Sequence, residues 1–287
     1  MPIRKDLEDL TQYIENSVTD FSEYIDVLQD DAYSIVRDAL LSFELNNGRI
    51  VAPKDLSKRL LSAQRELESV FGTKKYKIRT LEFLTDLGDI QDKTIDLHKN
   101  YNDLKGELNS LSEAKKIIYS QAQNAFSSGA IAESYIEPVK NLLARQALGR
   151  VSQKKALNLL QEWNKGETAS GRLNVGNKAP NLQKYGTVIA RDTAFSMQRT
   201  TNDIVAKEIG LTSFIYVGGL VKDSRDLCKH LVNLRRKITL DEMPKLITMY
   251  PEGLYPNTTK ENFMQVCGGY GCMHTALGVR SDKKEEN

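Results

Sequence analysis

The chain of 287 residues is 40% apolar and 27% charged, with a formal net charge of +2, which is typical of a soluble protein. Its length allows one large domain or two modest ones. No run of eighteen or more uncharged apolar residues occurs, so the sequence predicts no membrane-spanning helix. Acidic residues interrupt the N-terminal stretch that a secretory signal would need to be apolar. We therefore expect synthesis in a reducing cytoplasm, where three cysteines do not indicate a disulfide framework.

Charge is distributed unevenly along the chain. Residues 1–50 hold eleven acids and four bases, a balance of −7, which leaves +9 for the remaining residues. Residues 151–185 alone hold six bases and two acids. Such a split is typical of solvated helix faces. It would also suit an acidic arm that meets a basic partner, beside a body that approaches nucleic acid.

Residues 1–165 are predicted to form a helical body. Apolar residues three and four positions apart from Leu7 to Leu28 predict an acidic N-terminal helix over 4–29, which either packs on this body or docks a partner. Further helices are expected over 30–46, 55–72, 76–111, 113–127, 131–148 and 152–164. Gly106 is one of two glycines that could bend or break the longest of these.

The composition changes at residues 166–180, where glycines and a proline occur and the helical spacing of apolar residues is lost. This segment indicates a linker or hinge. After it we expect a helix over 182–209, a strand at Phe214–Val217 and a short helix near 240–249. The predicted fold is therefore mainly α. An elongated multi-helix body is followed by a small α+β domain over 181–280 and a charged tail over 281–287.

Nearly all cysteine and histidine residues fall in the last sixty positions. The potential metal ligands are Cys228, His230, Cys267, Cys272 and His274. Four of them would complete a structural zinc site, although their spacings are not those of ordinary zinc fingers. A disulfide from Cys228 to Cys267 or Cys272 is a second interpretation. Plain packing of small buried cysteines is a third.

A catalytic Cys–His pair is a further reading, because Cys272 and His274 would share one face of an extended segment. The sequence marks neither an orienting third group nor an oxyanion site, so we expect no enzyme. Residues 268–271 precede no helix and no lysine follows them, so they predict a tight turn rather than a phosphate-binding loop.

The alternation of Tyr270, Cys272 and His274 places these side chains on one face of an extended segment. Gly268 and the glycine after it permit a tight reversal before them. We therefore predict that Cys228, Cys272 and His274 meet in space. They would hold the C-terminal segment against the strand at 214–217 and stabilise the small domain.

Four motifs follow one another between about residues 180 and 280: Ala190-Arg191-Asp192-Thr193 on a helix, the strand, the segment 223–228 and the segment 268–274. In this order they resemble the phage head morphogenesis family, the minor head proteins typified by the F protein of phage Mu. The motif positions are Arg191, Thr193, Asp223, Arg225, Cys228, Gly268, Gly269, Tyr270, Cys272 and His274. Gly271 and Met273 stand where asparagine and arginine are common in the family, so no role of that arginine is carried over.

The resemblance implies a phage minor head protein, synthesised in the host cytoplasm and carried in the virion. It implies a structural component of the capsid interior, associated with the portal and acting in head assembly, DNA packaging or genome ejection. The implied partners are the portal protein, other capsid proteins and non-specifically bound DNA, with several copies around the portal. The residues themselves also leave open a metal-stapled nucleic-acid-binding protein, and a Cys/His hydrolase or toxin domain joined to a helical part.

Overall fold

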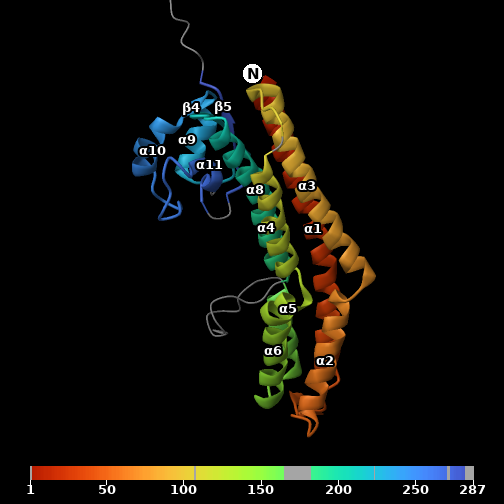
Figure 1. Cartoon of the computed structure of the whole chain (residues 1–287). Helices are drawn as coiled ribbons and strands as arrows, with labels where there is room; N and C mark the ends of the chain where they lie inside the picture. Colours follow the sequence, from red (N-terminus) through yellow and green to blue (C-terminus); the bar gives the residue numbers. More distant parts are fainter. Residues whose placement is uncertain (1, 107, 165–181, 223, 270–271, 282–287) are drawn as a thin grey trace, which may run out of the picture. The chain divides into compact units, whose positions relative to one another are not determined.

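The computed structural model describes residues 2–106, 108–164, 182–222, 224–269 and 272–281. It is mainly helical, with a small sheet among helices near the C-terminus (Figure 1), and this confirms the predicted fold class. The larger helices are α1 Pro2–Leu41, α2 Leu56–Phe71, α3 Lys74–Asn102, α4 Asn109–Ala125, α6 Glu137–Leu148, α7 Gln153–Asn164 and α8 Leu182–Glu208. The shorter elements are β1 Leu45–Asn46, β2 Arg49–Ile50, α5 Ser128–Ile131, the π-helix η1 Ala132–Ile136, β3 Ser213–Val217, α9 Asp226–Leu234, β4 Ile238–Thr239, the 3-10 helix η2 Leu240–Glu242, α10 Met243–Met249, α11 Phe263–Val266 and β5 Thr275–Val279.

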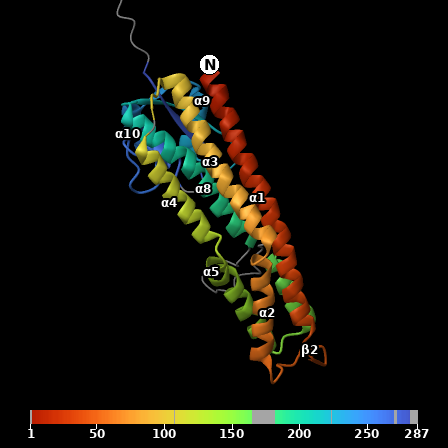
Figure 2. The ribbon, with the colours of Figure 1, turned by 45° about the vertical axis from the view of Figure 1, so that its right-hand side comes forward.

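The N-terminal helix is longer than predicted. One unbroken helix, α1, runs from Pro2 to Leu41 (Figure 2), where separate helices over 4–29 and 30–46 were expected. The prediction was wrong because Asp30 and Asp31 are exposed and interrupt only the outer face. The apolar stripe continues beneath them through buried Ala32. The stripe from Leu7 to Leu28 is itself buried, so this helix packs on the chain rather than presenting an apolar face to a partner.

The predicted helix over 76–111 divides in two. α3 ends at Asn102, Asp103 and Gly106 follow with φ of 53° and 78°, and α4 begins at Asn109. Left-handed backbone of this kind cannot continue a right-handed helix, so the break falls near the expected Gly106.

The chain folds into two compact units. Unit 1 comprises Met1–Val18, Phe83–Ala122 and Ala190–Asn287, and unit 2 comprises Thr19–Glu82 and Gln123–Ile189. This division differs from the predicted domains over 1–165 and 181–280, because the first turns of α1 and much of α3 and α4 group with the C-terminal segment. The predicted linker over 166–180 and all but the first residue of the tail over 281–287 lie outside the described residues.

Unit 2 consists of packed helices and a short β-hairpin. The rings of Phe21 and Phe126 meet edge to face at 4.8 Å, and the Tyr76 hydroxyl donates to the carbonyl of Phe126 at 2.7 Å. Strands β1 and β2 form an antiparallel hairpin around Asn47 and Gly48, whose φ values of 50° and 72° match the tight turn that Asn-Gly favours. The sequence predicted a helix as far as residue 46, whereas α1 ends at Leu41 and this hairpin follows it.

Unit 1 contains a three-stranded antiparallel sheet in the order β4-β3-β5, in which β3 is the predicted strand extended by one residue. Strand β5 pairs with β3 from Ser213 opposite Val279 to Val217 opposite Thr275. The free edge of β5 is closed by side chains. Gln198 donates to the carbonyl of Ala276 at 3.1 Å, and the side-chain oxygen of Asn202 accepts from the Gly278 amide at 2.7 Å. Helix α8 thus satisfies backbone groups that a further strand would otherwise pair.

Candidate functional site

Cys228, Cys272 and His274 lie together in the interior of unit 1. The two sulfur atoms are 4.0 Å apart, and the Cys272 sulfur is 3.4 Å from Nδ1 of His274. The three potential ligand atoms all lie within 4.8 Å of one another. Each of these residues is at most 5% exposed. The prediction that these three side chains meet is therefore confirmed.

The spacing of these atoms suits a metal ion. Around tetrahedral zinc, bonds of about 2.3 Å to sulfur and 2.0–2.1 Å to nitrogen place two sulfurs about 3.8 Å apart and a sulfur and a nitrogen about 3.5 Å apart. The corresponding separations here are 4.0 and 3.4 Å. The cluster of Cys228, Cys272 and His274 could therefore hold a metal ion.

Tyr216 on β3 contacts all three residues of the cluster. Its hydroxyl lies 3.4 Å from the sulfur of Cys228 and 3.5 Å from that of Cys272. Its ring stacks on the imidazole of His274 with centroids 5.4 Å apart and an interplanar angle of 12°. Tyr216 is fully buried and fixes the ring of His274 beside the two sulfurs.

The backbone brings the ligands together for identifiable reasons. Since Val217 pairs with Thr275, the residue before β5 lies beside the end of β3, and a Cβ on Gly218 would come 2.9 Å from the Cα of His274. Gly268 lies against both sulfurs, because a Cβ there would overlap Cys228 Sγ and come 2.9 Å from Cys272 Sγ. Helix α9 delivers Cys228 from the other side with its buried apolar face. The absence of a side chain at Gly268 leaves the room that the sulfurs occupy.

The sulfur atoms differ in acidity. A hydrogen bond from Cys228 holds the pKa of Cys272 well below its usual value, and His274 and the Arg199 charge act in the same direction against burial. The same hydrogen bond, together with burial, raises the pKa of Cys228. Cys272 therefore gives up its proton more readily than Cys228 does. A thiolate is the form of cysteine that binds metals.

Arg199 on α8 supports the segment that carries two of the potential ligands. It is 8% exposed, and its guanidinium donates to the backbone carbonyls of His274 and Cys272. Sequence reasoning missed both Arg199 and Tyr216. The signal for Arg199 was present, since a base four residues after Phe195 interrupts the apolar face of a helix.

Two of the five predicted ligands do not join the cluster. The thiol of Cys267 donates to the carbonyl of Met264 at 3.5 Å, and the ring of His230 packs on Tyr250 with centroids 5.3 Å apart. All three cysteines are free thiols, so the structure contains neither of the disulfides considered from the sequence.

The remaining motif positions have mostly local roles. Arg225 precedes α9 and packs against Gly253, and Gly269, with a φ of 89°, packs on the backbone of the same residue. Arg191 and Thr193 are half-buried on α8, and Nε of Arg191 has no hydrogen-bond partner among the described residues. Asp223 and Tyr270 lie outside the described residues.

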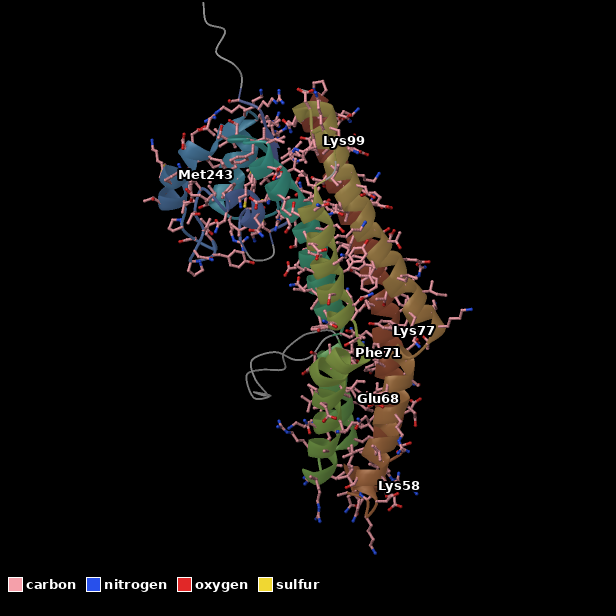
Figure 3. The ribbon with its side chains drawn as sticks, viewed as in Figure 1. Lys58, Glu68, Phe71, Lys77, Lys99 and Met243 are labelled. Carbon is pink, nitrogen blue, oxygen red and sulfur yellow. The ribbon has the colours of Figure 1, made fainter. Side chains whose placement is uncertain are left out.

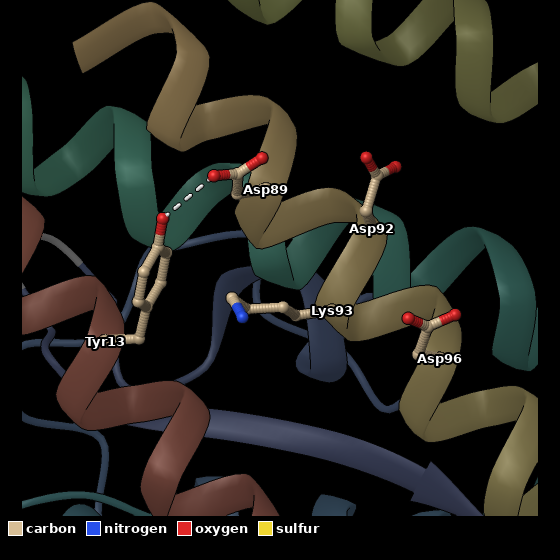
Figure 4. Close-up of a pocket in the computed structure, with 5 residues that line it drawn as sticks. All are labelled: Tyr13, Asp89, Asp92, Lys93 and Asp96. Carbon is tan, nitrogen blue, oxygen red and sulfur yellow. Dashed lines mark hydrogen bonds between the residues drawn. The ribbon is translucent and has the colours of Figure 1, made fainter. Parts of the chain in front are cut away.

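A second, open depression occurs elsewhere on unit 1, between α1 and α3 (Figure 4). It is lined by Tyr13, Asp89, Asp92, Lys93 and Asp96, and the Tyr13 hydroxyl donates to Asp89 at 3.2 Å. Lys93 lies over the Tyr13 ring at 4.8 Å. Burial, reinforced by neighbouring aspartates, raises the pKa of Tyr13 to about 12. The carboxylates are exposed and follow one outer face of α3, as expected for a solvated helix surface.

No protein-family model matches the chain, and neither a curated protein nor a solved structure is detectably similar to it. The likeness to phage minor head proteins therefore depends on the motifs alone. Among the described residues, no helix combines the length and the apolar character needed to cross a membrane.

Proposed function

We propose that the chain is a phage minor head protein, a structural and assembly factor of the capsid interior rather than an enzyme. The ordered motifs over residues 180–280 suggest it. The observation that carries it is the burial of Cys228, Cys272 and His274, which join α9 to the segment leading into β5. In this proposal the motifs build a small stable domain that other head proteins recognise.

The burial of the same residues favours a structural role over the hydrolase or toxin alternative. A catalytic cysteine must reach its substrate, and reactive cysteines are partly exposed, whereas buried structural cysteines are inert. Cys272 has the lowered pKa of a nucleophile, but it is 5% exposed and packs against the Tyr216 hydroxyl and Gly268. A thiolate in such a place is better suited to hold a metal or a hydrogen bond than to attack a substrate.

The proposed partners are the portal protein and other capsid proteins, with several copies of the chain around the portal. The proposed location is the virion, after synthesis in the host cytoplasm. The proposed activity is head assembly, DNA packaging or genome ejection. The motif resemblance supports the partners, the location and the activity alike.

Mass spectrometry of purified virions of the phage that encodes the chain tests the proposal. We expect the protein in a small, fixed number of copies per portal, and we expect phage lacking the gene to yield defective heads. Complementation with a Cys272→Ser chain separates the alternatives, provided that the variant remains folded, because a scaffold should still be incorporated while a cysteine hydrolase would lose its activity. Absence of the protein from virions, together with normal heads without it, would contradict the proposal.

We also propose that the metal suited to the cluster is zinc in a structural role. Two thiolates and an imidazole are ligands that zinc prefers, and two thiolates balance its charge in a buried place. The hydroxyl of Tyr216 lies beside both sulfurs, where a fourth ligand would be needed. Bound zinc would cross-link α9 to the C-terminal segment and so stabilise the small domain.

A further inference from the structure

One end of unit 2 is formed by the β1–β2 hairpin and the starts of α2 and α7. We call it the basic tip and define it as residues 41–60 and 144–158. Backbone hydrogen bonds join its two segments, since the Ile50 amide donates to Val151 at 2.9 Å and the Gln153 amide donates to Gly48 at 3.1 Å. The basic tip is therefore one continuous surface.

Its charge is strongly one-sided. The two segments contain eight bases and two acids, which are Glu44 and Asp55. Asp55 pairs with Arg59 at 3.0 Å. The other seven bases are exposed, and none forms an ion pair with a described residue: Arg49, Lys54, Lys58, Arg145, Arg150, Lys154 and Lys155. A surface of this kind attracts a polyanion.

Several of these bases lie in the first turns of helices, where positive charge destabilises the helix. α2 begins at Leu56 with Lys58 in its first turn, and α7 begins at Gln153 with Lys154 and Lys155 in its first turn. Neither first turn contains an acid, and Asp55 at the N-cap of α2 makes no capping hydrogen bond with its side chain. The start of a helix carries partial positive charge, so acids stabilise it and bases weaken it. An anion bound at the tip would relieve this repulsion.

The other side chains of the basic tip discriminate between polyanions. Four of the seven unpaired bases are lysines, and the one aromatic residue, Phe43, is buried. Protein interfaces are depleted in lysine and enriched in aromatic residues, so an acidic protein is a poor fit. Sites for single-stranded nucleic acid stack bases on exposed aromatic rings, which the tip lacks. A duplex backbone needs only cations and hydrogen-bond donors.

We propose that the basic tip binds the phosphate backbone of double-stranded nucleic acid without sequence preference. Arg49 on the hairpin forms a β-bridge with Ser152, so it lies next to Lys154 and Lys155 on α7. These three residues form the centre of the proposed contact. DNA is also a partner that the motif resemblance implies, but the contact is assigned to the tip from residues outside those motifs, so its test is separate from that of the proposed head role.

Binding of the full-length protein to a fluorescein-labelled duplex of about 30 base pairs tests the proposal by fluorescence anisotropy over a range of salt concentrations. We expect a triple variant, Arg49→Gln with Lys154→Gln and Lys155→Gln, to bind at least about tenfold more weakly at ~50 mM salt. The slope of log K against log salt should become shallower by about 2.7, since each phosphate contact contributes about 0.9. A second variant, Lys54→Gln with Lys58→Gln and Arg150→Gln, should show the same change if the first does not fold.

The matched control is Arg65→Gln with Lys74→Gln and Lys77→Gln, which removes three exposed, unpaired bases of unit 2 outside the tip. Figure 3 shows Lys77 and Lys58 at opposite ends of the α2 region. The control should bind like the unmodified protein. Equal weakening by the control would overturn the proposal. So would stronger binding to a poly-glutamate peptide, to vesicles containing phosphatidylserine or to the corresponding single strand.

Discussion

The guanidinium of Arg199 donates to the backbone carbonyl of His274, with Nη2 at 2.9 Å and Nε at 3.3 Å. It also reaches the carbonyl of Cys272. Both carbonyls belong to the segment that carries two of the three potential metal ligands. Arg199 is buried, so water does not replace these hydrogen bonds. Helix α8 thereby fixes the backbone of the cluster as well as the edge of β5.

Replacement of Arg199 by methionine should destabilise unit 1 by about 3 kcal/mol, because two buried carbonyls would lose their charged donor. Urea denaturation of the full-length protein measures the change. Lys99→Met is a suitable control, since Lys99 is exposed and its loss should change stability by less than about 0.5 kcal/mol. An Arg199→Met protein as stable as the control would show that these hydrogen bonds do not support the fold.

Zinc should bind the purified, reduced protein in equimolar amount, as measured by elemental analysis after reconstitution. Cobalt in its place should give the visible absorption of a tetrahedral thiolate site. His274→Gln should lose the metal, whereas His230→Gln should retain it, because His230 packs on Tyr250 and lies outside the cluster. Three freely titrating thiols and no retained metal after reconstitution would leave plain packing as the explanation of the cluster.

Gly268→Ala should destabilise the protein by about 2 kcal/mol, because the added methyl group would overlap the sulfur of Cys228 and crowd that of Cys272. Gly219 offers a matched control, since a Cβ there would meet no atom within 4 Å. Thermal unfolding of the two variants gives the comparison. Equal melting temperatures would mean that the turn moves away from the sulfurs at no cost.

His98 should make unit 1 sensitive to acid. It is fully buried between the side chains of Asn102 and Asn202, and burial lowers its pKa from 6.5 to about 4. An unfolded chain binds a proton at His98 below pH 6.5, while the folded protein does so only near pH 4. Stability from this group is therefore complete above pH 6.5 and falls as the pH drops toward 4, by on the order of 3 kcal/mol.

Denaturation of the unmodified protein and of His98→Gln between pH 4 and 7 isolates this effect, because the other titrating groups are common to both. The variant should be less stable at neutral pH but should lose less stability on acidification. Parallel pH profiles would show that His98 does not titrate in this way.

Local apolar periodicity predicted most of the helices. It worked at α8, at α2 and in the region of η2 and α10, where apolar positions recur along one face. It failed at β5, because all five of its residues are buried and the strand shows no alternation of apolar and polar side chains. The sequence also could not predict that Met1–Val18 groups with Ala190–Asn287, since a local pattern carries no information on contacts between distant segments.

The site was predicted in part. Spacing indicated that Cys272 and His274 share a face, because this depends only on neighbouring residues in the chain. The prediction that they meet Cys228, which lies 44 positions away, used the tight reversal that Gly268 permits. Tyr216 was placed correctly on a strand, but its contact with the two sulfurs depends on the register between β3 and β5. His230 and Cys267 were included on composition, which cannot tell a ligand from a residue that faces another neighbour.

The hydroxyls of Thr11 and Thr275 lie 2.7 Å apart although 264 positions separate them in the chain. At a translation rate of about 5–20 residues per second, Thr11 would wait roughly 13–53 s for its partner to be synthesised. All segments of unit 2 precede Ala190, so that unit is free to form during this interval. The second half of α1 could then pack while its first half still exposes Leu7 and Ile14 on the nascent chain. We therefore expect ribosome-bound chains that stop before β5 to depend most on chaperones, and the first helix to complete its packing among the last events of biosynthesis.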